Sequence, residues 1–463
     1  AMMTARLTLR YRTLIADHDQ LLAPAGISVT GHEFHRTTVE PRAGHAAAWR
    51  VNGEPTGFSL DPAGVGRETV HASYLHLHWA GYPEVAQRFA YAVHDHAASR
   101  SERQSVLRPA ERRSSRSPVP DLHHHGDRDV AEGLVDLAVN VRLPAPPDWL
   151  STIINSTTQQ LAAYPNTDAA TKAIAEAHGV TVDQVLPTSG GAEAFTLLAR
   201  AFRPERPLII HPQFTEPEAA LVAAGYQPRR LILSPATGFR LDADLLPADA
   251  DLVVVGNPTN PTSVLHPASL INSLRWAGRL VVVDEAFMDA VPGETETLIS
   301  DDLTRVVILR SLTKTWGLAG LRAGYVIGDP TLIASMRRQQ PPWSVSTPAL
   351  AAMVACLTPR SRSLAAAAAV EIASRRNYLV EQLADLGLKV AGKPSAPFVL
   401  VDTSGLADDQ KPGWLRLALR DHGIAVRRGE TFPGLGPDWI RIAVREPDVI
   451  DQLVAALRRL VRI

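Results

Sequence analysis

The residues best suited to chemistry lie in the segment 310–322, which reads Arg-Ser-Leu-Thr-Lys-Thr-Trp-Gly-Leu-Ala-Gly-Leu-Arg and follows a short apolar run. A lysine such as Lys314, flanked by hydroxyls and small residues, can hold its amine over a bound cofactor. The hydroxyls of Ser311 and Thr313 and the guanidinium of Arg322 are suited to hold the phosphate of such a cofactor. Because most single lysines are solvated surface charges, this interpretation needs support from other motifs.

A carboxylate follows a second apolar run. Asp284 comes directly after 280–283 and is followed by Glu-Ala-Phe. A buried aspartate needs a cationic or hydrogen-bonding partner, because desolvation otherwise raises its pKa and neutralises it. A protonated pyridine nitrogen is one such partner, and a cap on the following turn is the structural alternative.

Two further motifs also follow strand-like runs. The segment 256–262, Gly-Asn-Pro-Thr-Asn-Pro-Thr, contains Asn260, and the segment 188–193, Thr-Ser-Gly-Gly-Ala-Glu, contains Gly191 and opens a helical pattern. Backbone N–H groups at the start of a helix favour an anion, and ligands of open α/β sheets collect at the carboxyl ends of the strands. Alone, each motif would indicate only a turn.

The elements that position these motifs begin near residue 130. From there, short runs that are apolar on both faces alternate with helical segments, which predicts a parallel sheet covered on both sides. The runs are 208–210, 252–255, 280–283 and 306–309. The alanine-rich segment 363–386, stopped by Gly387, predicts a helix that links to a smaller lobe. That lobe is expected to end with a strand at 439–444 and a helix at 449–461.

The first part of the chain has a different composition, since 12 of the 16 histidines precede position 126. Alternating stretches at 6–12 and 69–77 predict strands and 84–94 predicts a helix, so residues 1–97 are expected to form a small α/β module. Residues 98–129 are predicted to be a linker, because the stretch 99–117 holds six arginines and two glutamates without apolar periodicity.

The overall composition excludes several classes of protein. The chain has 463 residues and a formal net charge of -1, with 45% hydrophobic and 21% charged residues, which argues against a nucleic-acid partner, a membrane partner or disorder throughout. A single cysteine, Cys356, and the lack of any long apolar run predict a soluble cytoplasmic protein. No metal site is predicted, since histidines such as His76, His78 and those at 123–125 more often bind metal adventitiously.

Taken together and in this order, the four motifs resemble those of pyridoxal-phosphate enzymes of the aspartate-aminotransferase fold, fold type I. Within that family they are similar to the branch that holds histidinol-phosphate aminotransferase and L-threonine-O-3-phosphate decarboxylase. The resemblance runs from about residue 130 to the C-terminus. It implies a large, mostly parallel-sheet domain at 165–344 and a small α/β lobe made from 130–164 and 345–463.

The resemblance also implies a role for each matching residue. Lys314 would bind pyridoxal phosphate covalently, Asp284 would pair with its pyridinium nitrogen, and Asn260 would donate to its phenolic oxygen. Phe214 would stack on the pyridine ring. Tyr164 would reach across a dimer interface to the phosphate of the neighbouring cofactor, which implies a homodimer. The residues matching the phosphate cup are Gly191, Ala192, Ser311, Thr313 and Arg322.

Substrate recognition would fall to two arginines and one amide. Arg427 and Arg441 resemble substrate-binding arginines, because planar guanidinium groups bind phosphate or carboxylate bidentately. Asn140 resembles part of an N-terminal segment that closes over the substrate. Where many relatives have tyrosine after Asp-Glu-Ala, this chain has Phe287, which favours the decarboxylase branch. The cofactor serves as an electron sink, and the groups that fix the substrate decide which bond breaks.

Residues 3–96, including 31–35 and 72–79, resemble the C-terminal end of the glutamine amidotransferase domain of cobyrinate a,c-diamide synthase. In that family the histidine matching His76 works with a nucleophilic cysteine, and no cysteine precedes Cys356 here. We therefore expect a vestigial or docking module without glutaminase activity.

Combined with the family branch, this module predicts decarboxylation of L-threonine-O-3-phosphate to aminopropanol phosphate in cobalamin biosynthesis. The alternative is an aminotransferase of histidinol phosphate or an aromatic amino acid, and a third possibility is a scaffold with a relic site. The motifs alone do not separate the first two reactions.

Overall fold

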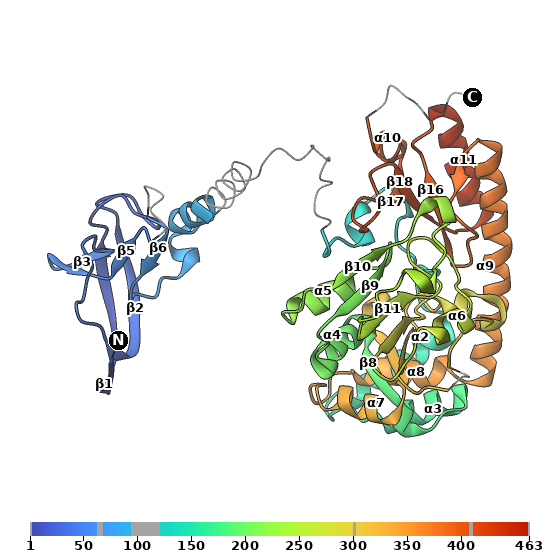
Figure 1. Cartoon of the computed structure of the whole chain (residues 1–463), viewed down its shortest axis with the longest axis horizontal. Helices are drawn as coiled ribbons and strands as arrows, with labels where there is room; N and C mark the ends of the chain where they lie inside the picture. The colour runs from blue at the N-terminus through green and yellow to red at the C-terminus, as the bar shows by residue number, and fades with distance from the viewer. Residues whose placement is uncertain (1, 63–67, 94–120, 300–301, 407–410, 462–463) are drawn as a thin grey trace. The chain divides into compact units, whose positions relative to one another are not determined.

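The computed structural model describes residues 2–62, 68–93, 121–299, 302–406 and 411–461. The chain divides into two compact units, Ala1–Arg116 and Ser117–Ile463 (Figure 1). Of the predicted linker, residues 98–120 lie outside the described residues. Its last part, residues 121–129, belongs to the second unit, where Asp129 is buried.

The first unit is the small α/β module that the sequence predicts. One sheet has the strand order β2-β1-β3-β4, two further strands pair with each other, and residues 83–93 are helical. A small core forms around Leu14, Val29, Trp49 and Val85. The strands are β1 (Met2–Ile15), β2 (Ser28–Thr38), β3 (Trp49–Val51), β4 (Glu54–Thr56), β5 (Phe58–Leu60) and β6 (Val70–Ala72).

A seven-stranded sheet forms the centre of the second unit and confirms the predicted mostly parallel sheet. Its strand order is β10-β9-β11-β12-β13-β14-β8, and only β14 runs antiparallel to its neighbours within this sheet. The strands are β8 (Val185–Ser189), β9 (Pro207–His211), β10 (Arg229–Ile232), β11 (Leu252–Gly256), β12 (Leu280–Asp284), β13 (Val306–Ser311) and β14 (Ala323–Gly328).

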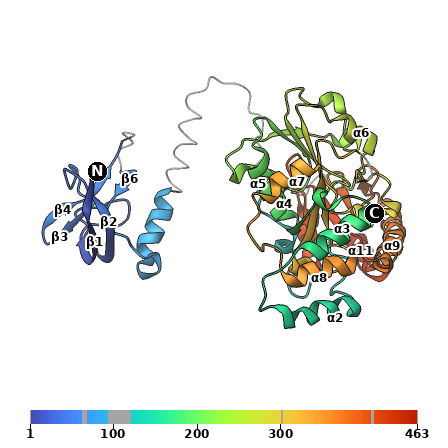
Figure 2. The same ribbon diagram turned by 90° about the horizontal axis from the view of Figure 1, so that it is seen from below.

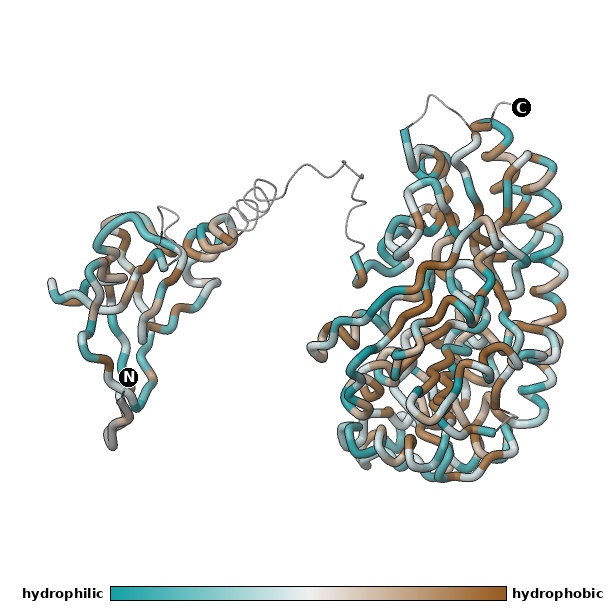
Figure 3. Tube along the Cα trace, viewed as in Figure 1, coloured by the Kyte–Doolittle hydropathy of each residue, from teal (hydrophilic) through white to brown (hydrophobic). Residues whose placement is uncertain are grey.

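The apolar runs of this sheet are buried on both faces because helices cover both faces. Successive side chains point to opposite sides, so each strand contributes to two cores. In β11, Val253 and Val255 join one core and Val254 joins the other. Figure 3 shows that these central strands are mostly hydrophobic, whereas the helices around them alternate between hydrophobic and hydrophilic residues. The helices around the sheet are α2 (Asp148–Ser156), α3 (Asp168–His178), α4 (Gly190–Phe202), α5 (Glu216–Ala223), α6 (Ala268–Ser273), α7 (Pro330–Arg337) and α8 (Thr347–Cys356).

The smaller lobe contains a five-stranded sheet of order β15-β16-β18-β17-β7. Its strands are β7 (Val135–Leu137), β15 (Lys389–Val390), β16 (Phe398–Asp402), β17 (Ile424–Arg428) and β18 (Trp439–Ala443), and its helices are α10 (Trp414–Asp421) and α11 (Pro447–Leu460). The predicted linking helix is α9 (Pro359–Asp385), which runs along both sheets (Figure 1).

Helices α2 and α8 pack with the large sheet, although the predicted boundaries assign them to the small lobe. The two helices contact each other (Figure 2). Leu150 and Leu350 belong to the core on one face of that sheet. The difference arises because the apolar faces of these helices fit the large sheet, a choice that short helical patterns do not reveal. Within the described residues, no helix is both long enough and apolar enough to span a membrane.

Helix α9 offers a matched test of the small-lobe core. Leu379 is fully buried in that core, whereas Leu364 on the same helix is 45% exposed. We expect Leu379→Ala to lower the free energy of unfolding by about 2–5 kcal/mol, through lost burial and the cavity left behind. Leu364→Ala should change it by no more than about 0.5 kcal/mol. Urea unfolding of both variants checks this, and equal losses would contradict the packing.

Candidate active site

Three neighbouring parallel strands bring the chemical motifs to one edge of the large sheet. Gly256 at the end of β11 lies opposite Asp284 at the end of β12, and β13 ends at Ser311 beside them. Asn260 and Lys314 follow β11 and β13 directly. Because the carboxyl ends of parallel strands meet at the same edge, the motifs converge there, as ligand sites of open α/β sheets do.

A cavity of about 440 Å³ lies at this edge. It is lined by every predicted site residue except Asp284 and Tyr164. These lining residues are Asn140, Gly191, Ala192, Phe214, Asn260, Ser311, Thr313, Lys314, Arg322, Arg427 and Arg441. Asp284 lies at the strand end beside the lining residue Ala286, whereas Tyr164 points elsewhere.

The amine of Lys314 and the carboxylate of Asp284 perturb each other across this edge. Burial, followed by the nearby charges of Arg441 and Arg322, lowers the pKa of Lys314 to about 8, and Asp284 opposes that shift. Burial raises the pKa of Asp284 to about 6, against a hydrogen bond from the Ala286 N–H at 3.1 Å and the charge of Lys314. At neutral pH the site therefore holds an amine that loses its proton readily and a carboxylate that needs a cationic partner.

The start of α4 and the loop after β13 form a site suited to phosphate. Gly190 adopts φ +75°, and a Cβ there would lie 2.7 Å from Nη2 of Arg322, so glycine is required. The hydroxyls of Ser311 and Thr313 lie 2.8 Å apart, and Arg322 is held by the Ala319 carbonyl at 2.9 Å. A helix N-terminus, two hydroxyls and a guanidinium together fit a bound phosphate.

Two amides complete the cavity and fit the rest of such a cofactor with its substrate. Asn140 is buried, yet neither its Oδ1 nor its Nδ2 has a partner among the described residues. The Oδ1 of Asn260 accepts a hydrogen bond from Nη1 of Arg441 at 2.5 Å, which leaves the Nδ2 of Asn260 as the donor toward a ligand. Arg441 also donates to the Ala138 carbonyl and packs over Phe398.

Arg427 lines the cavity, but its charge is already compensated. Its Nη1 donates to Asp129 at 3.1 Å, its Nη2 donates to the His124 carbonyl at 2.8 Å, and it packs over Phe432. The same Asp129 also accepts from Nε of Arg428 at 2.8 Å. The net positive charge near Arg427 is therefore smaller than the sequence alone suggests, because Asp129 already pairs with this arginine.

The residues 121–129 are the part of the site that sequence reasoning missed. His124 and His125 line the cavity, His125 pairs with Glu216 at 2.8 Å, and Thr215 donates to the Leu122 carbonyl at 2.7 Å. The triple histidine next to the start of the sheet-forming region was the available signal. The predicted linker 98–129 includes these histidines, because its boundary follows from the composition of 99–117 and not from residues 121–129 themselves.

Two aromatic residues behave differently from each other. Phe287 is buried, lines the cavity and packs edge-on against Phe398, so no hydroxyl occupies that position. Tyr164 is 76% exposed and stacks on Trp343, itself 58% exposed. Tyr164 does not reach the cavity of its own chain.

Comparison with known proteins identifies the family. A model of the aminotransferase class I and II family matches residues 132–457, and the chain belongs to that family. A solved structure, the histidinol-phosphate aminotransferase from Clostridium acetobutylicum, superposes with a TM-score of 0.64 at 22% identity, covering 71% of this chain and 99% of that chain. The fold is pyridoxal-phosphate fold type I, and the cofactor of the family is pyridoxal phosphate.

Particular relatives differ in their names. A histidinol-phosphate aminotransferase of Mycobacterium bovis is 48% identical over 332 residues, 71% of this chain and 88% of that protein. A threonine-phosphate decarboxylase of Salmonella typhimurium is 29% identical over 336 residues, 70% of this chain and 90% of that protein. The N-terminal residues match a hydrogenobyrinate a,c-diamide synthase of Thermobifida fusca, 55% identical over 92 residues, 20% of this chain and 19% of that synthase.

The raised pKa of Asp284 gives a test in cofactor-free protein. The folded state binds the Asp284 proton more tightly than the unfolded chain does, so ionisation of Asp284 costs stability as the pH rises from about 4 to about 6. Asp284→Asn removes this cost. We expect the stability of the variant relative to wild type to increase over that pH range.

Urea midpoints of both proteins between pH 4 and 7 measure this difference, in which the titrations of groups that do not interact with Asp284 cancel. A bound cofactor with a protonated ring nitrogen should reverse the sign above pH 6, because the wild-type carboxylate then has its partner. A difference that is constant with pH would contradict the assignment.

Proposed function

We propose that this protein is a pyridoxal-phosphate enzyme that decarboxylates L-threonine-O-3-phosphate to aminopropanol phosphate in cobalamin biosynthesis. The observation that carries the proposal is the presence, in one chain, of an aminotransferase-family unit and a module similar to a hydrogenobyrinate a,c-diamide synthase. A physical link between two such units favours a substrate from the same pathway.

The charge of the cavity supports a substrate with two anionic groups. Three guanidiniums line it, and the position of Arg322 beside Gly190 suits the cofactor phosphate. Arg441, buried next to Asn260, is then the group for the substrate carboxylate, with its Nε still without a partner among the described residues. The region of Arg427 and His125 is left for the substrate phosphate.

The cofactor supplies an electron sink for the bond broken at Cα. Arg441 and Asn140 would orient the substrate so that its carboxylate is the group that leaves. The Cα–carboxylate bond breaks, carbon dioxide departs and a proton is added to Cα. Nζ of Lys314, with a pKa lowered to about 8, is suited to deliver that proton near neutral pH.

An aminotransferase acting on histidinol phosphate is the second candidate, favoured by the 48% identity to the M. bovis protein of that name. Histidinol phosphate carries a phosphate and no carboxylate, so in that reaction Arg441 would meet a carboxylate only in the 2-oxo acid that accepts the amino group. Phe287 is consistent with the decarboxylase, because the hydroxyl that many relatives place there is missing.

We further propose a homodimer in which Tyr164 reaches the cofactor phosphate of the partner. The exposed stack of Tyr164 on Trp343 supports this, because two large aromatic side chains exposed side by side are typical of an interface.

A product assay separates the candidates. We expect the protein loaded with pyridoxal phosphate to release carbon dioxide and aminopropanol phosphate from L-threonine-O-3-phosphate, and Lys314→Ala to abolish this turnover together with the visible absorbance of the bound cofactor. Histidinol phosphate with a 2-oxo acid serves as the comparison. Stoichiometric transfer of amino groups to the 2-oxo acid, without carbon dioxide, would overturn the decarboxylase assignment.

A further inference from the structure

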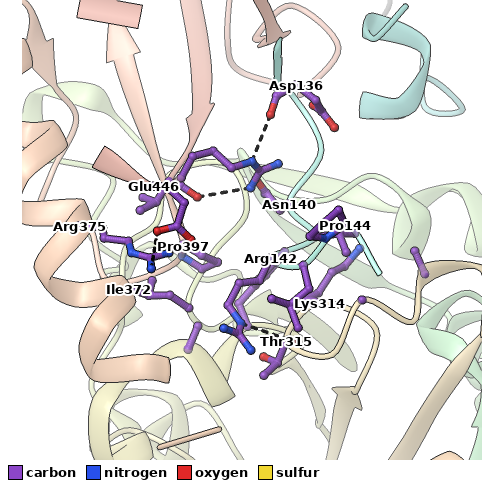
Figure 4. A pocket seen from close by; sticks show the side chains of 18 of the residues that line it. Asp136, Asn140, Arg142, Pro144, Lys314, Thr315, Ile372, Arg375, Pro397 and Glu446 are labelled. Atoms are coloured by element: carbon purple, nitrogen blue, oxygen red, sulfur yellow. Dashed lines mark hydrogen bonds and ion pairs between the residues drawn. The ribbon is translucent and has the colours of Figure 1, made fainter. Parts of the chain in front are cut away.

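Three residues outside the cavity at the strand ends hold the chain at Lys314 and at the residue that follows it. The backbone N–H of Arg142 donates to the Lys314 carbonyl at 2.9 Å. Nε of Arg142 donates to the Thr315 carbonyl at 3.2 Å (Figure 4). The side chain of the same threonine is held as well, because Oγ1 of Thr315 donates to Oδ2 of Asp289 at 2.5 Å. We call Arg142, Thr315 and Asp289 the Lys314 frame.

The Lys314 frame lies along a second cavity of about 640 Å³, which Lys314 and Asn140 also line. Thr315 is buried, and Oδ1 of Asp289 has no partner among the described residues. Burial disfavours the charged form of Asp289, and the hydrogen bond from the Thr315 hydroxyl opposes this effect. Removing either group would leave the other without this hydrogen-bond partner.

A close approach of two backbones reinforces the Lys314 frame. Gly317 adopts φ +68°, and a Cβ there would lie 3.0 Å from the Ala145 carbonyl and 3.2 Å from that of Leu143. The segment 142–145 therefore runs along the loop 314–317 in direct backbone contact. Although the two segments are about 170 residues apart in sequence, they form one strip of closely packed backbone beside the site.

This strip determines where the lysine amine can go. Arg142 holds the carbonyls of Lys314 and Thr315, and Asp289 holds the Thr315 side chain, so the backbone is anchored at Lys314 and directly after it. The backbone conformation limits the rotamers that a side chain can adopt. Displacement of a reacting group by about 1 Å costs on the order of 100-fold in rate.

We propose that Arg142, Thr315 and Asp289 are positioning residues that fix the amine of Lys314 for bond formation with the cofactor. The inference rests on the proposed cofactor-binding role of Lys314. It also accounts for Asn140, since anchoring Arg142 holds this unpartnered amide, two residues away, at the wall shared by both cavities.

Thr315→Val tests the Lys314 frame, because it removes the hydroxyl while nearly preserving volume. We expect the visible absorbance of lysine-bound cofactor to develop about tenfold more slowly when the full-length apoprotein is mixed with pyridoxal phosphate. In the holoenzyme, kcat should fall about tenfold with KM changed less than twofold. Thr315→Ser should restore both, since it returns the donor to Asp289.

The matched control is Thr403→Val. Thr403 is a buried threonine in the small lobe whose Oγ1 donates to the Asp438 carbonyl at 2.6 Å. Loss of the Thr403 hydroxyl should leave the rate of cofactor binding and kcat unchanged, whatever the substitution does to thermal stability.

Arg142→Lys is the second variant, for use if Thr315→Val does not fold. It keeps the positive charge and the backbone N–H but loses the Nε donor, and we expect absorbance to develop about threefold more slowly. Arg376→Lys is its control, a buried arginine bonded to the Ser395 carbonyl. Wild-type rates in Thr315→Val, or in Arg142→Lys if only that variant folds, would overturn the inference.

These outcomes are distinct from failure of the proposed function. The rate of absorbance development does not depend on which substrate the enzyme uses. If wild type showed no absorbance that Lys314→Ala removes, the role of Lys314 itself would fail, and the inference would fail with it.

Discussion

The site depends on one lysine amine that is buried at the edge of the large sheet, where its pKa is lowered to about 8. Burial and the charges of Arg441 and Arg322 favour the neutral form of Lys314, and Asp284 favours the charged form. This balance exists only because β11, β12 and β13 are parallel neighbours that end together. The apolar cores on both faces of the large sheet hold those strand ends in place.

The charged groups around this amine come from segments that are far apart in the sequence. The small lobe supplies Arg441 and Arg427, the large sheet supplies Asp284, and the loop before β14 supplies Arg322. Helix α9 connects the two sheets. One arginine differs from the others, because Asp129 compensates Arg427 from a segment that precedes the first strand of the small lobe. The cavity thus has a positive wall at Arg441 and a more neutral one at Arg427, which suits unequal recognition of two anionic groups.

Much of this arrangement could be predicted from the sequence. Apolar runs such as 280–283 identified the strands, and the motifs that follow them identified the residues now found around one cavity, since strand ends and helix starts are local properties. The match to the aminotransferase class I and II family confirmed the fold and the cofactor. The roles of the individual site residues remain predictions that the geometry supports.

Contacts between distant segments could not be predicted in this way. Residues 121–129 are polar and aperiodic, and they fold onto the site because Asp129 pairs with arginines about 300 residues away. The same holds for Arg142 and Lys314, and for α2 and α8, whose packing partners depend on tertiary fit. The local sequence pattern of a short helix does not show which sheet its apolar face packs against.

The most direct test of the central claim is to reduce the cofactor-loaded protein with borohydride and locate the added mass by peptide mass spectrometry. Five lysines are available, and all except Lys314 are exposed. The account predicts that the cofactor mass is found on Lys314 alone. Attachment to Lys172, Lys389, Lys393 or Lys411, or none at all, would contradict it.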